Sequence, residues 1–153
     1  MDKKLGTLYI VSTPIGNLSD ITYRAVKTLQ DVNTIAAEDT RKSRILLSHY
    51  NIKTRTISYF EHNKFQKIDK IKQVLKKGDS VALITDAGTP GISDPAYKLI
   101  RKAIEIGCKV ESIPGPSAVI SSLISSGLPT DRFIFEGFLP PKKGRKRRIE
   151  NLK

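Results

Sequence analysis

Short apolar runs recur along the chain, and each has the length of a buried β-strand rather than that of a helix. The run VALI at residues 81–84 is the clearest, because it stops abruptly at Thr85 and Asp86. Phe133–Glu136 fits either a further strand or an extended segment that leads out of the domain. The pattern predicts five strands, at Thr7–Ser12, Thr34–Ala37, Arg55–Tyr59, Val81–Thr85 and Val110–Ile113.

Between these runs, apolar residues return every three or four positions, which is the spacing of amphipathic helices. Asp94 followed by Pro95 predicts a helix start with Asp94 as the N-cap. Glycine follows three of the predicted helices, as is typical of helix ends. The helices are predicted from Ile21 to Val32, at Arg41–Tyr50, from Phe65 to Leu75, from Tyr97 to Ile104, and at Ala118–Ser125.

Strict alternation of strand and helix is typical of parallel strands joined by crossover helices. Right-handed crossovers place helices on both faces of such a sheet. We therefore expect one α/β domain with a five-stranded, mostly parallel sheet.

Turn-forming and charged residues gather in the loops that follow the predicted strands. Parallel sheets bind ligands beyond the carboxyl ends of their strands, so these loops predict a binding site at one edge. Each loop taken alone would also be explained as an ordinary turn. The loops are Thr13–Asn17, Glu38–Arg41, Phe60–Asn63, Asp86–Gly91 and Pro114–Ser117.

Several common catalytic patterns are missing from the sequence. There is no GxxxxGK[ST] phosphate loop, no GxGxxG after the first strand and no GxSxG nucleophile turn. Two histidines and one cysteine make a zinc cluster unfavourable, and no metal site is predicted. The glycines, hydroxyls and carboxylates of the edge suit a polar small molecule that carries its own reactive group.

Composition adds a candidate partner and a compartment. The net charge is +12, and half of it comes from residues 142–153, which carry seven lysines and arginines and one glutamate. This excess favours an anionic partner such as nucleic acid, although a solvated basic surface has the same composition. The single Cys108, the lack of a long apolar run and the lack of a signal peptide predict a cytoplasmic protein without membrane contact.

Five motifs resemble the tetrapyrrole methylase superfamily, and within it the branch that methylates ribosomal RNA. They are LYIVSTPIGNLSDIT at 8–22, AAEDTR at 36–41, ITDAGTPGISDP at 84–95, IPGPSA at 113–118 and FEGFLP at 135–140. The resemblance implies S-adenosylmethionine (SAM) as methyl donor and the ribose 2′-hydroxyl of a cytidine in 16S ribosomal RNA as acceptor. It also implies a homodimer of two-domain subunits. Residues 1–138 would form the N-terminal α/β SAM-binding domain, and 139–153 a basic linker and the start of a missing C-terminal domain.

The resemblance also implies a set of cofactor-binding residues. Physically, Asp86 can accept hydrogen bonds from the ammonium or ribose hydroxyls of SAM, although it would equally cap its own turn. Gly88 allows a close backbone approach, and the helix that Ser117 opens suits a carboxylate. The set comprises Pro14, Ile15 and Gly16 after the first strand, Asp86, Ala87, Gly88 and Thr89 after the fourth, and Ser117 and Ala118 after the fifth.

Methyl transfer from a sulfonium is an in-line displacement that depends mainly on positioning. A ribose hydroxyl is a poor nucleophile, so a base or a cation should assist it. The candidate catalytic residues are Asp39 and Arg41 as substrate-edge groups and His62 as a weaker base. Asp39 could instead be ordinary charge at a helix N-terminus, and His62 a surface histidine, so the sequence does not identify the base.

A basic run after Pro140 and Pro141 is the candidate RNA-binding segment. Its cations would contact phosphates, or the run would be only a solvated linker. Two other functions stay open: a small-molecule methylase of the tetrapyrrole type, and a nonenzymatic RNA-binding module. The candidate RNA-binding residues are Lys142, Lys143, Arg145, Lys146, Arg147 and Arg148.

Overall fold

A computed structural model describes residues 4–59, 64–94 and 96–152 of the chain. It confirms the predicted α/β fold with a five-stranded, wholly parallel sheet in the order β3-β2-β4-β1-β5. The strands are β1 (Leu8–Val11), β2 (Thr34–Ala37), β3 (Thr56–Ser58), β4 (Val81–Ile84) and β5 (Val110–Ile113).

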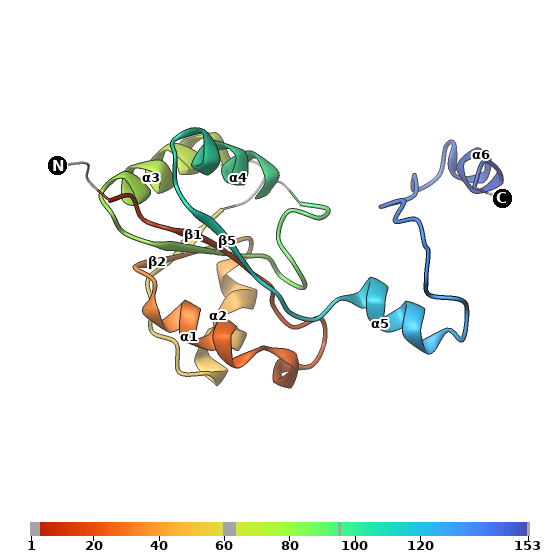
Figure 1. Ribbon diagram of the computed structural model, residues 1–153, viewed down its shortest axis with the longest axis horizontal. Helices are drawn as coiled ribbons and strands as arrows, with labels where there is room; N and C mark the ends of the chain where they lie inside the picture. Colours follow the sequence, from red (N-terminus) through yellow and green to blue (C-terminus); the bar gives the residue numbers. More distant parts are fainter. Residues whose placement is uncertain (1–3, 60–63, 95, 153) are drawn as a thin grey trace.

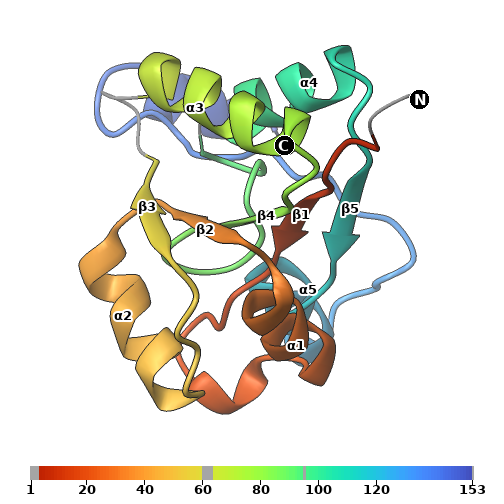
Figure 2. The ribbon, with the colours of Figure 1, turned by 90° about the vertical axis from the view of Figure 1, so that its left-hand side faces the viewer.

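Helices cover both faces of the sheet, as the crossover rule predicts. In Figure 2, α1 and α2 lie on one face and α3 and α4 on the other. Residues of β1 alternate between the two layers: Leu8 and Ile10 pack towards α3 and α4, and Val11 packs towards α1 and α2. The helices are α1 (Tyr23–Asp31), α2 (Thr40–His49), α3 (Lys64–Lys76), α4 (Ala96–Glu105), α5 (Ala118–Ser125) and α6 (Arg145–Glu150), with a 3-10 turn, η1, at Leu18–Asp20.

The strand order places the loops of the predicted edge next to one another. The chain runs outward from β1 through β2 to β3, returns to β4 between β1 and β2, and then crosses β1 to reach β5. Leu8 of β1 pairs with Val81 of β4 and with Val110 of β5, so the three strands end side by side. The loops that follow these strands are therefore neighbours in space.

The last third of the chain leaves this α/β body. α5 has a strongly apolar sequence, AVISSLIS, yet none of its residues is buried. Phe133–Glu136 forms no strand, so the interpretation as an extended lead-out holds. Ile134 in this segment is 84% exposed. Figure 1 shows α5, the extended segment and α6 standing away from the sheet.

Candidate cofactor and substrate site

The loops after β1 and β4 are joined at the carboxyl edge. Thr13 and Gly88 form an antiparallel bridge, with N–H to carbonyl distances of 3.0 and 3.1 Å in the two directions. The hydroxyls of Ser12 and Thr89 lie 2.7 Å apart and add a second link. Gly88 has a φ of 78°, a left-handed conformation that glycine adopts without strain. This glycine is what allows the β4 loop to turn back onto β1.

The loop after β5 lies against the same place. A Cβ built on Gly115 would stand 2.8 Å from the Cβ of Ser12, so the close approach of these two loops requires glycine. Two residues further on, Ser117 is the N-cap of α5, and its hydroxyl accepts from the backbone N–H of Ile120 at 3.4 Å. The predicted helix start at Ser117 is thus present at the edge.

A cavity of 740 Å³ lies where these loops meet. It brings together Ile15, Asp86, Ala87, Gly88, Thr89, Ser117 and Ala118 of the predicted cofactor set. Pro14 and Gly16 belong to the same turn as Ile15 but do not line the cavity. Phe135 and Phe138 of the extended segment line it as well, and reasoning from the sequence missed them. Both belong to the FEGFLP motif at 135–140, which could have pointed to them because it is one of the five motifs of the family resemblance.

Asp86 is held by two partners from the β2 side of the sheet. One carboxylate oxygen accepts from the backbone N–H of Asp39 at 3.2 Å, and the other accepts from the Lys42 ammonium at 2.6 Å. This contact raises the pKa of Lys42. Asp86 therefore ties the β4 loop to the start of α2. A carboxylate has about four lone-pair sites, so it can still accept from a ligand.

Glu38, the first residue after β2, stands between this cavity and a second one. Its carboxylate accepts hydrogen bonds from the Thr85 hydroxyl and from the backbone N–H of Asp86, the latter at 3.3 Å. Glu38 lines both cavities. Reasoning from the sequence included it in the loop after the second strand but assigned it no role. Glu38 and Asp86 together fix the relative position of the β2 and β4 loops.

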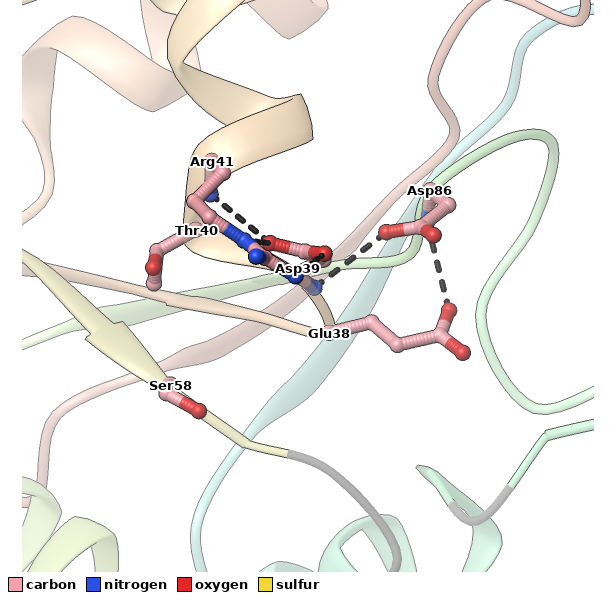
Figure 3. A pocket seen from close by; sticks show the side chains of 6 residues that line it. All are labelled: Glu38, Asp39, Thr40, Arg41, Ser58 and Asp86. Carbon is pink, nitrogen blue, oxygen red and sulfur yellow. Dashed lines mark hydrogen bonds and ion pairs between the residues drawn. The ribbon is translucent and has the colours of Figure 1, made fainter.

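The second cavity, of 470 Å³, contains the predicted substrate-edge residues (Figure 3). Asp39 is the N-cap of α2 and accepts from the backbone N–H of Arg41 at 2.9 Å. The Arg41 guanidinium donates two further hydrogen bonds to the same carboxylate, at 3.2 and 3.0 Å. Bonding to Arg41 lowers the pKa of Asp39 to about 2. At neutral pH Asp39 is a weak proton acceptor and holds Arg41 in place.

The other candidates lie elsewhere. His62 falls outside the described residues. The basic run from Lys142 to Arg148 is exposed and does not line either of these two cavities. Helix α6 begins within it, at Arg145, and Arg148 pairs with Glu136 of the extended segment.

The part of the chain that the structure describes holds neither a candidate metal site nor a membrane-spanning helix. Over residues 4–59, 64–94 and 96–152, no cluster of three or more histidine, cysteine or acidic side chains could hold a metal ion. No helix within those ranges is both long and apolar enough to span a bilayer.

The fold and this edge define the class: a parallel α/β domain with a ligand cavity at the carboxyl ends of its strands. Residues 7–153 match the family described as Tetrapyrrole (Corrin/Porphyrin) Methylases. The chain belongs to this family.

Several curated relatives share about half of their aligned residues with this chain. The chain is 54% identical over 147 residues to ribosomal RNA small subunit methyltransferase I of Mesorhizobium japonicum, covering 95% of this chain and 50% of that protein. It is 50% identical over 149 residues to the Thermotoga maritima protein of the same name, covering 97% of this chain and 67% of the relative. The chain spans about half the length of most curated relatives it matches.

Solved structures share the fold at low sequence identity. A cobalt precorrin-4 methyltransferase superposes with a TM-score of 0.64 at 18% identity, covering 78% of this chain and 49% of that one. A uroporphyrin-III-C-methyltransferase from Thermus thermophilus gives a TM-score of 0.61 at 18% identity, covering 81% and 54%. These similarities support the fold alone.

Proposed function

We propose that this chain is the N-terminal half of a SAM-dependent methyltransferase that methylates the ribose 2′-hydroxyl of a cytidine in small-subunit (16S) ribosomal RNA. The observation that carries the proposal is the 740 Å³ cavity, where the β1, β4 and β5 loops of a tetrapyrrole methylase converge. The ribosomal RNA substrate is supported by the names of relatives that are 50–54% identical.

The residues of this cavity suit SAM in size and chemistry. Ligand cavities for molecules of this class measure about 300–1,000 Å³. Ile15, Val119 and Phe135 offer apolar surface for an adenine ring. The N-terminus of α5 at Ser117 suits a carboxylate, and Asp86 and Glu38 suit an ammonium or ribose hydroxyls. When bound, SAM supplies an electrophilic methyl group on a sulfonium.

The neighbouring cavity is proposed to receive the ribose and its phosphates. Arg41, held by Asp39, presents a fixed cation there, which suits a phosphate or the developing charge on a 2′-oxygen. Because the pKa of Asp39 lies near 2, we assign it to positioning Arg41 rather than to proton abstraction. His62 stays the predicted base candidate.

The proposal extends to the domain organisation, the oligomeric state and the compartment of the full-length protein. Residues 1–138 would form the SAM-binding domain, and 139–153 a basic linker to a second domain that closes the cavity. The exposed apolar surface of α5 and of Phe138, which is 87% exposed, supports a covering partner. We propose a homodimer that acts in the cytoplasm, where ribosomal RNA is modified.

Methyl transfer from tritiated SAM to small ribosomal subunits tests the function. The full-length protein should label the RNA, and alkaline hydrolysis should leave a labelled dinucleotide, because a 2′-O-methyl group blocks cleavage of the adjacent phosphodiester. Label on a tetrapyrrole precursor instead would support the small-molecule methylase. RNA binding without transfer to either would support a nonenzymatic module.

A further inference from the structure

Helices α3 and α4 carry a large excess of positive charge on the face of the sheet opposite α1 and α2. Together they hold eight lysines and arginines against two acids, Asp69 and Glu105. Their apolar residues Ile71, Leu75 and Leu99 are fully buried against the sheet. Figure 2 shows the two helices side by side on this face. Lys98, Arg101 and Lys102 are exposed, and Lys72 is partly exposed.

A groove of 450 Å³ runs between these two helices. Tyr97 stands at this groove with 58% of its surface exposed, and its hydroxyl accepts from an Arg101 guanidinium nitrogen at 3.3 Å. An exposed aromatic ring among cations is a surface on which an unpaired base can stack. Four cations line the groove: Lys72, Lys98, Arg101 and Lys102.

The two acids of the groove are engaged in exposed ion pairs. Asp69 contacts Lys72 at 3.4 Å, and Glu105 contacts Lys102 at 2.6 Å and Arg101 at 3.5 Å. Exposed pairs of this kind contribute little stability, so a phosphate can replace the carboxylate at little cost. Of the described residues that line the groove, four carry a positive charge and two carry a negative charge, so the lining is rich in cations.

The groove and the candidate site are lined by residues that lie close together along the chain. Asp94 lines the 740 Å³ cavity and also caps α4, accepting from the backbone N–H of Ala96 at 2.8 Å. The next residue, Tyr97, already lines the groove. The start of α4 thus lies between a residue that lines the cavity, Asp94, and a residue that lines the groove, Tyr97.

We propose that the α3–α4 groove binds the phosphate backbone of the substrate RNA, with Tyr97 stacking on an unpaired base. The inference rests on the proposed function and adds a docking surface separate from the 142–148 run. Phosphate contacts are independent of sequence and sensitive to salt, because each neutralised phosphate releases counterions. The groove should thus contribute affinity and orientation.

The test compares two triple variants of the full-length protein by fluorescence anisotropy with a small-subunit ribosomal RNA transcript over a salt series. The groove variant is Lys72→Ser, Arg101→Ser, Lys102→Ser. The control, Arg24→Ser, Arg44→Ser, Lys53→Ser, removes the same charge from exposed positions on the α1–α2 side. The groove variant should lower the log–log salt slope by about 2 to 3, and the control by less than 1.

Tyr97→Ala supplies a second measurement that does not depend on charge. It should weaken RNA binding about tenfold while leaving the salt slope unchanged, because stacking releases no counterions. SAM affinity should stay the same in all three variants.

Two results together would overturn the groove proposal while RNA methylation by the wild type persists. They are equal salt slopes in the groove and control variants and an unchanged RNA affinity in Tyr97→Ala. A wild type that neither binds nor methylates RNA would overturn the proposed function as well.

Discussion

At the scale of single residues, Gly88 connects two loops of the site through its left-handed backbone. Its φ is 78°, and it makes both hydrogen bonds of the bridge to Thr13. Gly88→Ala should lower the free energy of unfolding by about 1–2 kcal/mol, because a Cβ disfavours this conformation. Urea denaturation measures the change.

Gly127 provides the control for this substitution. It has a similar φ of 72°, with no other atom within 4 Å of a built Cβ, and it follows α5, where nothing is buried. Gly127→Ala should leave the unfolding of the α/β body nearly unchanged. Equal destabilisation by both substitutions would show that the bridge between Thr13 and Gly88 contributes nothing to the stability of the α/β body.

The ion pair between Asp39 and Arg41 makes the stability of the fold depend on pH. The pKa of Asp39 is about 2, below its ordinary value of 3.8, so the folded state holds this proton less tightly than the unfolded state. The stabilisation of the folded state by ionised Asp39 is complete above about pH 4 and is lost as the pH falls towards 2.

Arg41→Gln should return the pKa of Asp39 towards its ordinary value in a carboxyl NMR titration. Arg44→Gln, on the same helix, should leave it low, and a low pKa in both variants would assign the effect to the helix N-terminus.

At the scale of elements, the basic run at the start of α6 makes its own prediction. Replacing Arg145, Lys146, Arg147 and Arg148 with serine in the full-length protein should weaken RNA binding and flatten its salt dependence, because all four are exposed cations. SAM affinity should change much less. If the salt slope is the same before and after, the run is a linker only.

The elements themselves were predictable from local pattern. The sequences VALI and TIAA are buried at every position and match the predicted strands within one residue. Asp94 and Ser117 cap the helices at which they were predicted, since capping depends on neighbours two or three residues away. Local pattern thus fixed the strand ends and with them the edge that carries the site.

Contacts between distant segments were not predictable in this way. Lys42 reaches Asp86 across 44 positions, and no spacing rule signals that pairing. Phe135 and Phe138 reach the cavity only because the extended segment passes it after α5. The strand order β3-β2-β4-β1-β5 likewise depends on packing over the whole sheet.

At the scale of the whole molecule, the α/β body carries two kinds of candidate binding surface, the cavities and the basic groove. The candidate cavities lie at the carboxyl ends of the strands, and the basic groove lies between α3 and α4 on one face of the sheet. The apolar α5 and the segment after it stand away from the body (Figure 1). This arrangement fits a small cofactor held at the edge and a large anionic substrate spread over the surface beside it.

Calorimetry of SAM binding to the full-length protein tests the central claim, that the edge around Asp86 holds the cofactor. The wild type should bind one SAM per chain, and Asp86→Ala should weaken binding by about 1–3 kcal/mol, the usual loss for a hydrogen bond to a charged group. Asp31→Ala removes the same charge from an exposed position on α1 and should have no effect. Unchanged SAM affinity in Asp86→Ala would contradict the account and remove this loop from the cofactor site.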